Sequence, residues 1–251
     1  MEPYVTSHTT NNITTIEFFH PQSNSLPGVI LSLLAQTIRQ AGEEKDSSVI
    51  VLKSAGTKAF CAGASFDELV QIQNESEGHE FFRGFAKVIN AMRTCPKLII
   101  ARIQGKCVGG GVGLASAADY AIAVKGSDVK LSELAVGIGP FVVGPAVERK
   151  MGTGPFSAMA IDATGWRSSE WAYKHGLFSD LHETTEQVDE AVNKLAHTLS
   201  QSSPDAMLEL KKIFWSGTDH WDTLLNERAS ISGRLILSEY SKKAIEKFKA
   251  K

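Results

Sequence analysis

Apolar residues along this chain follow two kinds of spacing, one typical of strands and one typical of helices. Residues 12–19 (NITTIEFF) alternate between polar and apolar positions and are rich in β-branched side chains, which predicts a strand. Three further runs are short and almost continuously apolar, as is typical of strands buried on both faces: 48–54 (SVIVLKS), 97–103 (KLIIARI) and 120–124 (YAIAV).

Helical spacing separates these strands and then takes over the chain. Apolar residues recur every three to four positions in 26–42, where Gly42 is expected to be the C-cap, and again in about 78–92. After about residue 143 the strand patterns end and the remaining segments are helical. Alternating strands and helices imply mostly parallel pairing. We therefore predict an α/β core in residues 1–200 and a helical region in residues 201–251, packed as one unit.

Composition and charge then limit the class of protein. The 251 residues are 43% hydrophobic and 22% charged, enough for a large core, and the net charge of −2 gives no electrostatic footprint for nucleic acid. No apolar stretch approaches membrane-spanning length, and the polar start lacks a signal pattern. The cysteines (Cys61, Cys95 and Cys107) match no metal or redox spacing. We expect a cytoplasmic protein without a metal, membrane or nucleic-acid partner.

The segment GKCVGGGVGLASAADY (105–120) holds five glycines in nine residues, which suggests three interpretations. Close helix packing is one. A dinucleotide-binding turn is another, because GVGLAS imitates G-x-G-x-x-G, but residues 104–108 separate these glycines from the preceding strand. We favour the third, a helix that begins near Gly110 or Gly111. The free N–H groups and the dipole of that helix end stabilise a negative oxygen, so the Gly110 amide is a candidate oxyanion donor.

A second turn of the same kind lies upstream. The segment GTKAFCAGASFDEL (56–69) follows the strand 48–54, tightens at Ala62–Gly63 and opens into a helix at Ser65 or Phe66. The Ala64 amide then points outward at a strand-to-helix junction, as the Gly110 amide does. Turns that follow parallel strands meet at the same end of a sheet. The sequence therefore predicts an oxyanion hole built from two backbone amides.

These segments, together with VKLSELAVGIGPFVVG and TGWRSSEWAYKHGLFSDL, resemble the successive blocks of the crotonase (enoyl-CoA hydratase/isomerase) superfamily over nearly the whole chain. The resemblance implies a spiral of ββα units and a C-terminal helical region that mediates trimers or hexamers. It implies a coenzyme A thioester as substrate, with no covalently bound cofactor. It assigns the oxyanion hole to Ala64 and Gly110. It also places these residues near the substrate: Asn24, Ala62, Phe66, Gly109, Gly113, Pro140 and Phe141. Lys247, Lys249 and Lys251 are candidates for the nucleotide phosphate or form a solvated helix face.

The resemblance departs from the family pattern at one acidic position. Hydratases of the family use two glutamates; Glu133 in LSEL matches the second, whereas Gly113 stands at the first. A double-bond isomerase needs one carboxylate, but a hydratase must also hold a water. The detailed sequence is nevertheless most similar to bacterial methylglutaconyl-CoA hydratases, which also have this glycine. We expect hydration of a short or branched 2-enoyl-CoA with Glu133 as acid/base, a Δ3,Δ2-enoyl-CoA isomerase as the alternative, and a non-catalytic thioester-binding protein as a third possibility.

Several other residues have structural interpretations. Glu133 itself is alternatively a surface glutamate at a cap after Ser132. Asp119 is expected to satisfy local amides. Cys61 and Cys107 are expected to be small buried residues rather than nucleophiles. The four tryptophans are expected to pack helices or a subunit interface: Trp166, Trp171, Trp215 and Trp221.

Overall fold

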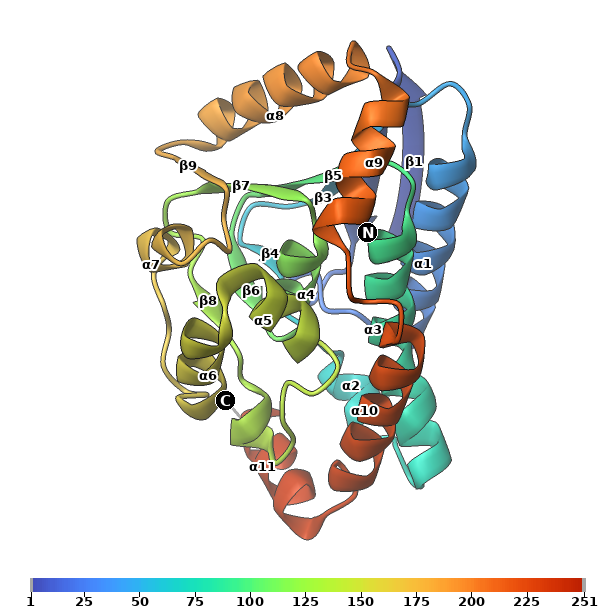
Figure 1. Cartoon of the computed structure of the whole chain (residues 1–251). Coiled ribbons are helices and arrows are strands. Elements are labelled where there is room, and N and C mark those ends of the chain that lie inside the picture. The colour runs from blue at the N-terminus through green and yellow to red at the C-terminus, as the bar shows by residue number, and fades with distance from the viewer. Residues whose placement is uncertain (1, 250–251) are drawn as a thin grey trace.

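A twisted six-stranded sheet runs through the computed structural model, which describes residues 2–249 (Figure 1). The strand order is β1-β2-β3-β5-β7-β9, and only β1 is antiparallel to its neighbour. The bounds are β1 Tyr4–Thr10, β2 Ile13–Phe19, β3 Val49–Ser54, β5 Leu98–Ile103, β7 Tyr120–Val124 and β9 Asp180–His182. A second sheet has three short parallel strands, β4 Ala59–Cys61, β6 Lys106–Val108 and β8 Val129–Lys130.

The two sheets make the chain a spiral of ββα units. In the first turn both β1 and β2 join the large sheet, and in the next three turns the pairs β3–β4, β5–β6 and β7–β8 each give one strand to the large sheet and one to the small sheet before a helix; this confirms the predicted α/β architecture. The helices of the first 200 residues are α1 Gly28–Glu43, α2 Phe66–Leu69, α3 Glu75–Thr94, α4 Gly110–Ala117, the 3-10 helix η1 Glu133–Val136, α5 Gly144–Met151, α6 Thr153–Ile161, α7 Ser169–Lys174 and α8 Thr185–Ser200.

Three details differ from the sequence-based predictions. Strand β1 is too polar to be predicted; it forms because Asn11 and Asn12, both at positive φ, turn it back onto β2. The short strands β4, β6, β8 and β9 were also not predicted from the residue pattern. The expected C-cap at Gly42 is wrong, because α1 continues to Glu43. Gly42 instead lets the helix approach Pro96, whose Cδ would lie 3.1 Å from a Cβ at this position.

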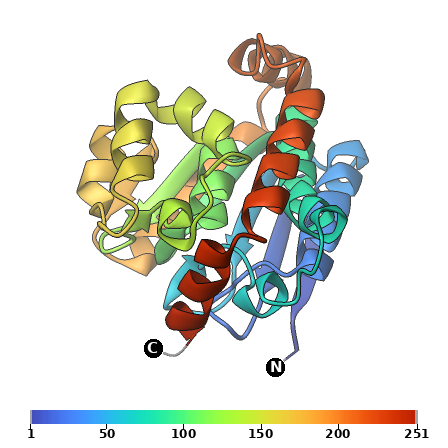
Figure 2. The same ribbon diagram turned by 90° about the horizontal axis from the view of Figure 1, so that it is seen from below.

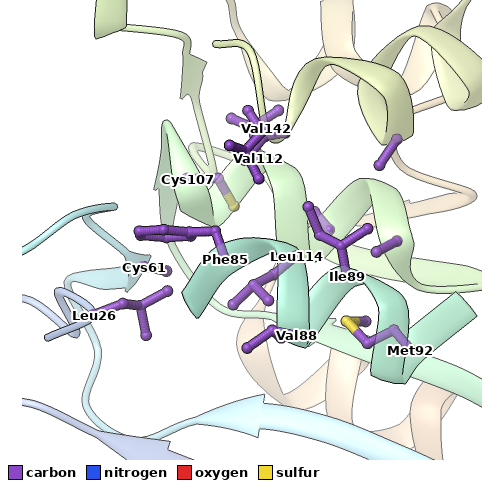
Figure 3. Close-up of a cluster of buried hydrophobic side chains, with 14 of the residues drawn as sticks. Leu26, Cys61, Phe85, Val88, Ile89, Met92, Cys107, Val112, Leu114 and Val142 are labelled. Carbon is purple, nitrogen blue, oxygen red and sulfur yellow. The ribbon is translucent and has the colours of Figure 1, made fainter. Parts of the chain in front are cut away.

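Helices cover both faces of the large sheet. The main core lies between one face and α1, α3 and α4, while α8 crosses the other face and packs on Val51, Ile100 and Ile122. Figure 3 shows α3 and α4 side by side, with Phe85 and Ile89 of α3 packed around Val112 and Leu114 of α4. This packing fixes the start of α4 against the middle of α3.

The C-terminal helices pack against this same core: α9 Pro204–Phe214, α10 Trp221–Leu235 and α11 Glu239–Lys249. Helix α10 lies along α3, and the two backbones touch where a Cβ on Gly78 would lie 2.7 Å from the Cα of Gly233. Helix α11 returns to η1 and α2, with Ile245 buried (Figure 2). Helices α9, α10 and α11 therefore join the core of their own chain; the role of the region 201–251 in trimer formation stays a prediction.

Candidate active site

The two predicted amide donors lie on loops that touch each other. Gly63, at φ +87°, turns the chain just before Ala64, and Gly110 is the first residue of α4. A Cβ on Gly63 would lie 2.8 Å from the Val108 carbonyl oxygen and 3.4 Å from the Gly110 nitrogen. Ala64 and Gly110 line one cavity, and neither N–H donates to an acceptor within residues 2–249. Both donors are thus available to a ligand oxygen.

Close packing also requires the glycine run, so the interpretation that we favoured less accounts for part of it. A Cβ on Gly110 would collide with the ring of Phe85, and a Cβ on Gly111 would collide with the carbonyl oxygen of Cys61. Helix α4 therefore reaches α3 and β4 more closely than any residue with a side chain would allow. The same contact places the first residue of α4, Gly110, at the cavity wall.

Glu133 is brought to this cavity by the end of β8. As the first residue of η1 it lies against Gly109, whose missing Cβ would be 2.9 Å from Glu133 Oε1. Its Oε2 is buried and has no hydrogen-bond partner within residues 2–249. Burial raises the pKa of this carboxyl from 4.5 to about 7. The alternative of a surface glutamate is wrong, and a carboxyl that titrates near neutral pH suits acid–base catalysis.

Gly113 does not line the cavity. The side chain of Val143 stands in front of it, with Cγ1 2.6 Å from where a Cβ would be, and Val143 itself forms part of the cavity wall. The Val143 side chain therefore occupies the space into which a first glutamate at position 113 would extend. No second carboxyl replaces it among the described lining residues, which leave Glu133 as the one ionisable side chain of the cavity.

The remaining predicted residues divide into two groups. Ala62, Phe66, Gly109, Pro140 and Phe141 all line the cavity. A second pocket at Gln22, Ser23 and Asp67 shares Ala62, Ala64 and Phe66 with it, so the two pockets are neighbours on this side of the molecule.

Asn24 does not line the cavity. Its Nδ2 donates to the carbonyl oxygens of Ala55 (2.7 Å) and Ala59 (2.9 Å), and its Oδ1 accepts from His20 N–H at 3.0 Å. These bonds hold the left-handed turn at Ser23–Asn24 against the loop that leads to β4. The side chain therefore shapes the entrance rather than facing the site.

Sequence reasoning missed several residues of the cavity wall. Phe82 and Phe85 come from α3. Ser232 comes from α10 and follows both phenylalanines by more than a hundred residues in the sequence. Apart from Glu133, the hydroxyls of Ser132 and Ser232 are the polar side-chain groups among the described lining residues. One signal for Ser232 was present in the sequence: it is a serine in the apolar stripe of an amphipathic helix.

The other candidates fall outside the cavity. Asp119 accepts from Ile99 N–H (2.7 Å), as expected, and also pairs with Lys211. Cys61 and Cys107 are fully buried, and burial raises the pKa of the Cys61 thiol to about 12. Trp215 and Trp221 pack edge to face in the core, whereas Trp166 is exposed beneath the ammonium groups of Lys106 and Lys130.

The C-terminal lysines are only partly described. Lys247 is exposed on α11, while the side chain of Lys249 and the whole of Lys251 lie outside the described residues. None of the helices within residues 2–249 is long and apolar enough to cross a bilayer.

The whole chain is similar to known proteins of one family. Residues 8–251 match the family described as enoyl-CoA hydratase/isomerase. The chain is 26% identical to a probable enoyl-CoA hydratase of Bacillus subtilis over 94% of its own length and 92% of the relative's. It is 28% identical to a short-chain-enoyl-CoA hydratase of Clostridium acetobutylicum, over 88% of this chain and 87% of that protein.

Solved structures agree in fold. An enoyl-CoA hydratase from Bacillus halodurans superposes with a TM-score of 0.89 at 22% identity, covering 97% of this chain and 99% of that one. The family match spans the spiral core, both glycine loops and the C-terminal helices. This protein therefore belongs to the enoyl-CoA hydratase/isomerase family and has the crotonase fold.

Proposed function

We propose that this protein hydrates a short, uncharged 2-enoyl-CoA, with Glu133 as its single acid/base. The observation that carries the proposal is one cavity on which two free backbone N–H groups lie together with one carboxyl of pKa about 7. Two relatives that align over most of their own length are named as enoyl-CoA hydratases, which supports hydration as the reaction.

The chemistry needs no further ionisable group. The thioester oxygen accepts hydrogen bonds from Ala64 and Gly110, which withdraws electrons from C3. The Glu133 carboxylate takes a proton from water while the water oxygen bonds to C3, and the resulting enolate is held by the same two amides. Glu133 then returns the proton to C2. Each amide donor is worth about 2.7–4 kcal/mol of transition-state stabilisation in comparable oxyanion holes.

The cavity wall favours an uncharged acyl group. Four phenylalanines line it, and among the described residues none of the lining side chains is a lysine, arginine or histidine. An acyl group of the methylglutaconyl type carries a second carboxylate, which would lose its water without gaining a cation. Burying an unpaired charge in this way costs several kcal/mol. A short or branched neutral chain therefore fits the wall better.

Isomerisation of a 3-enoyl-CoA is the second candidate. The observation that favours it is the Val143 side chain in front of Gly113, because it leaves one carboxyl beside the cavity. A single carboxylate can remove a proton from C2 and return it to C4 without any water.

A substrate panel separates these activities. Purified protein is incubated with crotonyl-CoA, 3-methylglutaconyl-CoA and 3-hexenoyl-CoA, and the conjugated thioester absorbance is followed. The proposal predicts that hydration lowers the absorbance of crotonyl-CoA and leaves that of 3-methylglutaconyl-CoA nearly unchanged, whereas isomerisation would raise the absorbance of 3-hexenoyl-CoA. Turnover of 3-hexenoyl-CoA alone would contradict the hydratase proposal. Acetyl-CoA binding by calorimetry without any turnover would instead indicate a thioester-binding protein.

A further inference from the structure

Ser232 is the polar exception on an apolar helix face. It belongs to the buried stripe of α10 and is 1% exposed. One turn earlier, Arg228 Nη1 contacts the carbonyl oxygen of Phe141 (3.4 Å), and the next residue, Gly233, touches Gly78 of α3. Ser232 therefore lies where α10 meets both α3 and the loop that carries Phe141, and it lines the cavity there.

Within the described residues the hydroxyl of Ser232 has no hydrogen-bond partner. Helical serines commonly donate to the carbonyl four residues earlier, as two in this protein's helices α4 and α10 do. Ser230 Oγ donates to Asn226 O (3.3 Å), and Ser116 Oγ donates to Val112 O (2.7 Å). Within residues 2–249 Ser232 Oγ makes no such bond, although its residue is buried. The fully enclosed, unpartnered side-chain atoms of the described residues are Arg83 Nε, Gln104 Oε1 and Glu133 Oε2, so the Ser232 hydroxyl keeps some exposure. Because Ser232 lines the cavity, this hydroxyl is available there to a ligand or a bound water.

We propose that Ser232 binds the water that adds to C3 of the enoyl thioester. This inference rests on the proposed hydratase activity. A reacting water needs two fixed contacts to be oriented, and Glu133 supplies one of them. The place in front of Gly113 is filled by Val143, and Ser132 belongs to the same segment as Glu133. Ser232 comes from a different element, so it can hold the water from a second direction.

The test separates water binding from proton transfer at C2. Ser232→Ala keeps Glu133 and both amides, and alanine favours a helix more than serine does. We expect kcat for crotonyl-CoA hydration to fall about tenfold, the usual worth of one lost hydrogen bond. Exchange of the C2 protons of butyryl-CoA in D2O needs no water at C3 and should keep its rate. Glu133→Gln should lose both activities.

Ser230→Ala is the matched control, since Ser230 lies on the exposed side of the same helix. It should hydrate crotonyl-CoA at the wild-type rate. Equal losses of hydration and exchange in Ser232→Ala would show a structural role and overturn the inference, as would an unchanged hydration rate. Wild-type protein that exchanges C2 protons but hydrates no member of the panel would overturn the proposed function, and this inference with it.

Discussion

Two buried carboxyls show how differently one fold can treat the same chemical group. The Asp119 side chain is 5% exposed, and each of its oxygens has a partner: Oδ2 accepts from Ile99 N–H and from Lys211 Nζ at 2.6 Å, and Oδ1 accepts from Trp215 Nε1 at 3.1 Å. Glu133 Oε2 is also buried but has no partner within the described chain. The first carboxyl is tied into the structure, and the second is left free to react.

The difference comes from the elements that surround each group. Asp119 stands at the start of β7, where Lys211 and Trp215 arrive from the C-terminal region and Lys150 donates to its backbone carbonyl at 3.0 Å. Glu133 faces glycine backbone and hydrocarbon. Burial alone raises a carboxyl pKa, whereas partners stabilise the ionised form. A buried carboxyl without partners lowers the stability of the folded protein. Here the resulting pKa of about 7 is useful for catalysis.

Glu133→Gln should have the largest effect on activity. The variant keeps the shape of the side chain but can neither take nor return a proton, so kcat should fall by about 10²–10⁴-fold. Acetyl-CoA affinity, measured by calorimetry, should stay within about threefold of wild type, because the amide donors are unchanged. Activity that survives the substitution would move the acid/base role away from Glu133.

Asp119→Ala should have the largest effect on stability. It leaves the Lys211 ammonium, 3% exposed, without its counter-ion, which typically costs about 3–5 kcal/mol. Urea unfolding measures the loss, and the activity of the folded protein should be unchanged. Glu209→Ala is the control, because it breaks an exposed pair with Lys212 and should cost less than about 1 kcal/mol. Similar losses in both variants would mean that burial does not distinguish the two pairs.

The pH dependence should separate the two roles of Glu133. As a base it must be ionised, so kcat should rise with pH through about 7. Stability should move in the opposite direction. The folded state holds the proton that the unfolded state releases above about 4.5, so this contribution is complete below that pH and is lost as pH rises through 7.

Unfolding experiments at pH 5 and pH 8 check this sign. Between these values, wild type should lose about 2 kcal/mol relative to Glu133→Gln, which cannot ionise. A difference of the opposite sign would mean that the carboxyl gains a partner when ionised.

The sequence predicts the backbone of the site better than its electrostatics. The apolar runs of β3, β5 and β7 and the two glycine turns are local signals, and they place Ala64 and Gly110 at the ends of neighbouring ββ units. The pKa of Glu133 depends on Gly109 and on the surrounding wall, and the Asp119–Lys211 pair joins residues 92 positions apart. Ser232 reaches the cavity only through the crossing of α10 over α3. Contacts of this range leave no periodic signal in one sequence.

Gly113 stands at the position where the family resemblance places a first glutamate. Its substitution should have a smaller effect than the substitutions at Glu133 and Asp119. In Gly113→Ala the new methyl group would lie 2.6 Å from Val143 Cγ1 and 2.9 Å from Val143 Cβ, so the Val143 backbone must shift together with its side chain, and we expect a cost of about 1–3 kcal/mol in the free energy of unfolding. Hydration should fall only modestly, because Gly113 does not line the cavity.

The double variant Gly113→Ala/Val143→Ala tests the reason for that cost. If the two side chains compete for one space, Gly113→Ala should cost less in the Val143→Ala background than in wild type, a coupling of about 0.5–1 kcal/mol in a double-mutant cycle. Additive costs would mean that the γ-methyl groups of Val143 are not what opposes a side chain at position 113. The position of the missing first glutamate would then not be closed by those methyl groups, and the isolation of Glu133 as the one carboxyl of the described cavity wall would need another explanation.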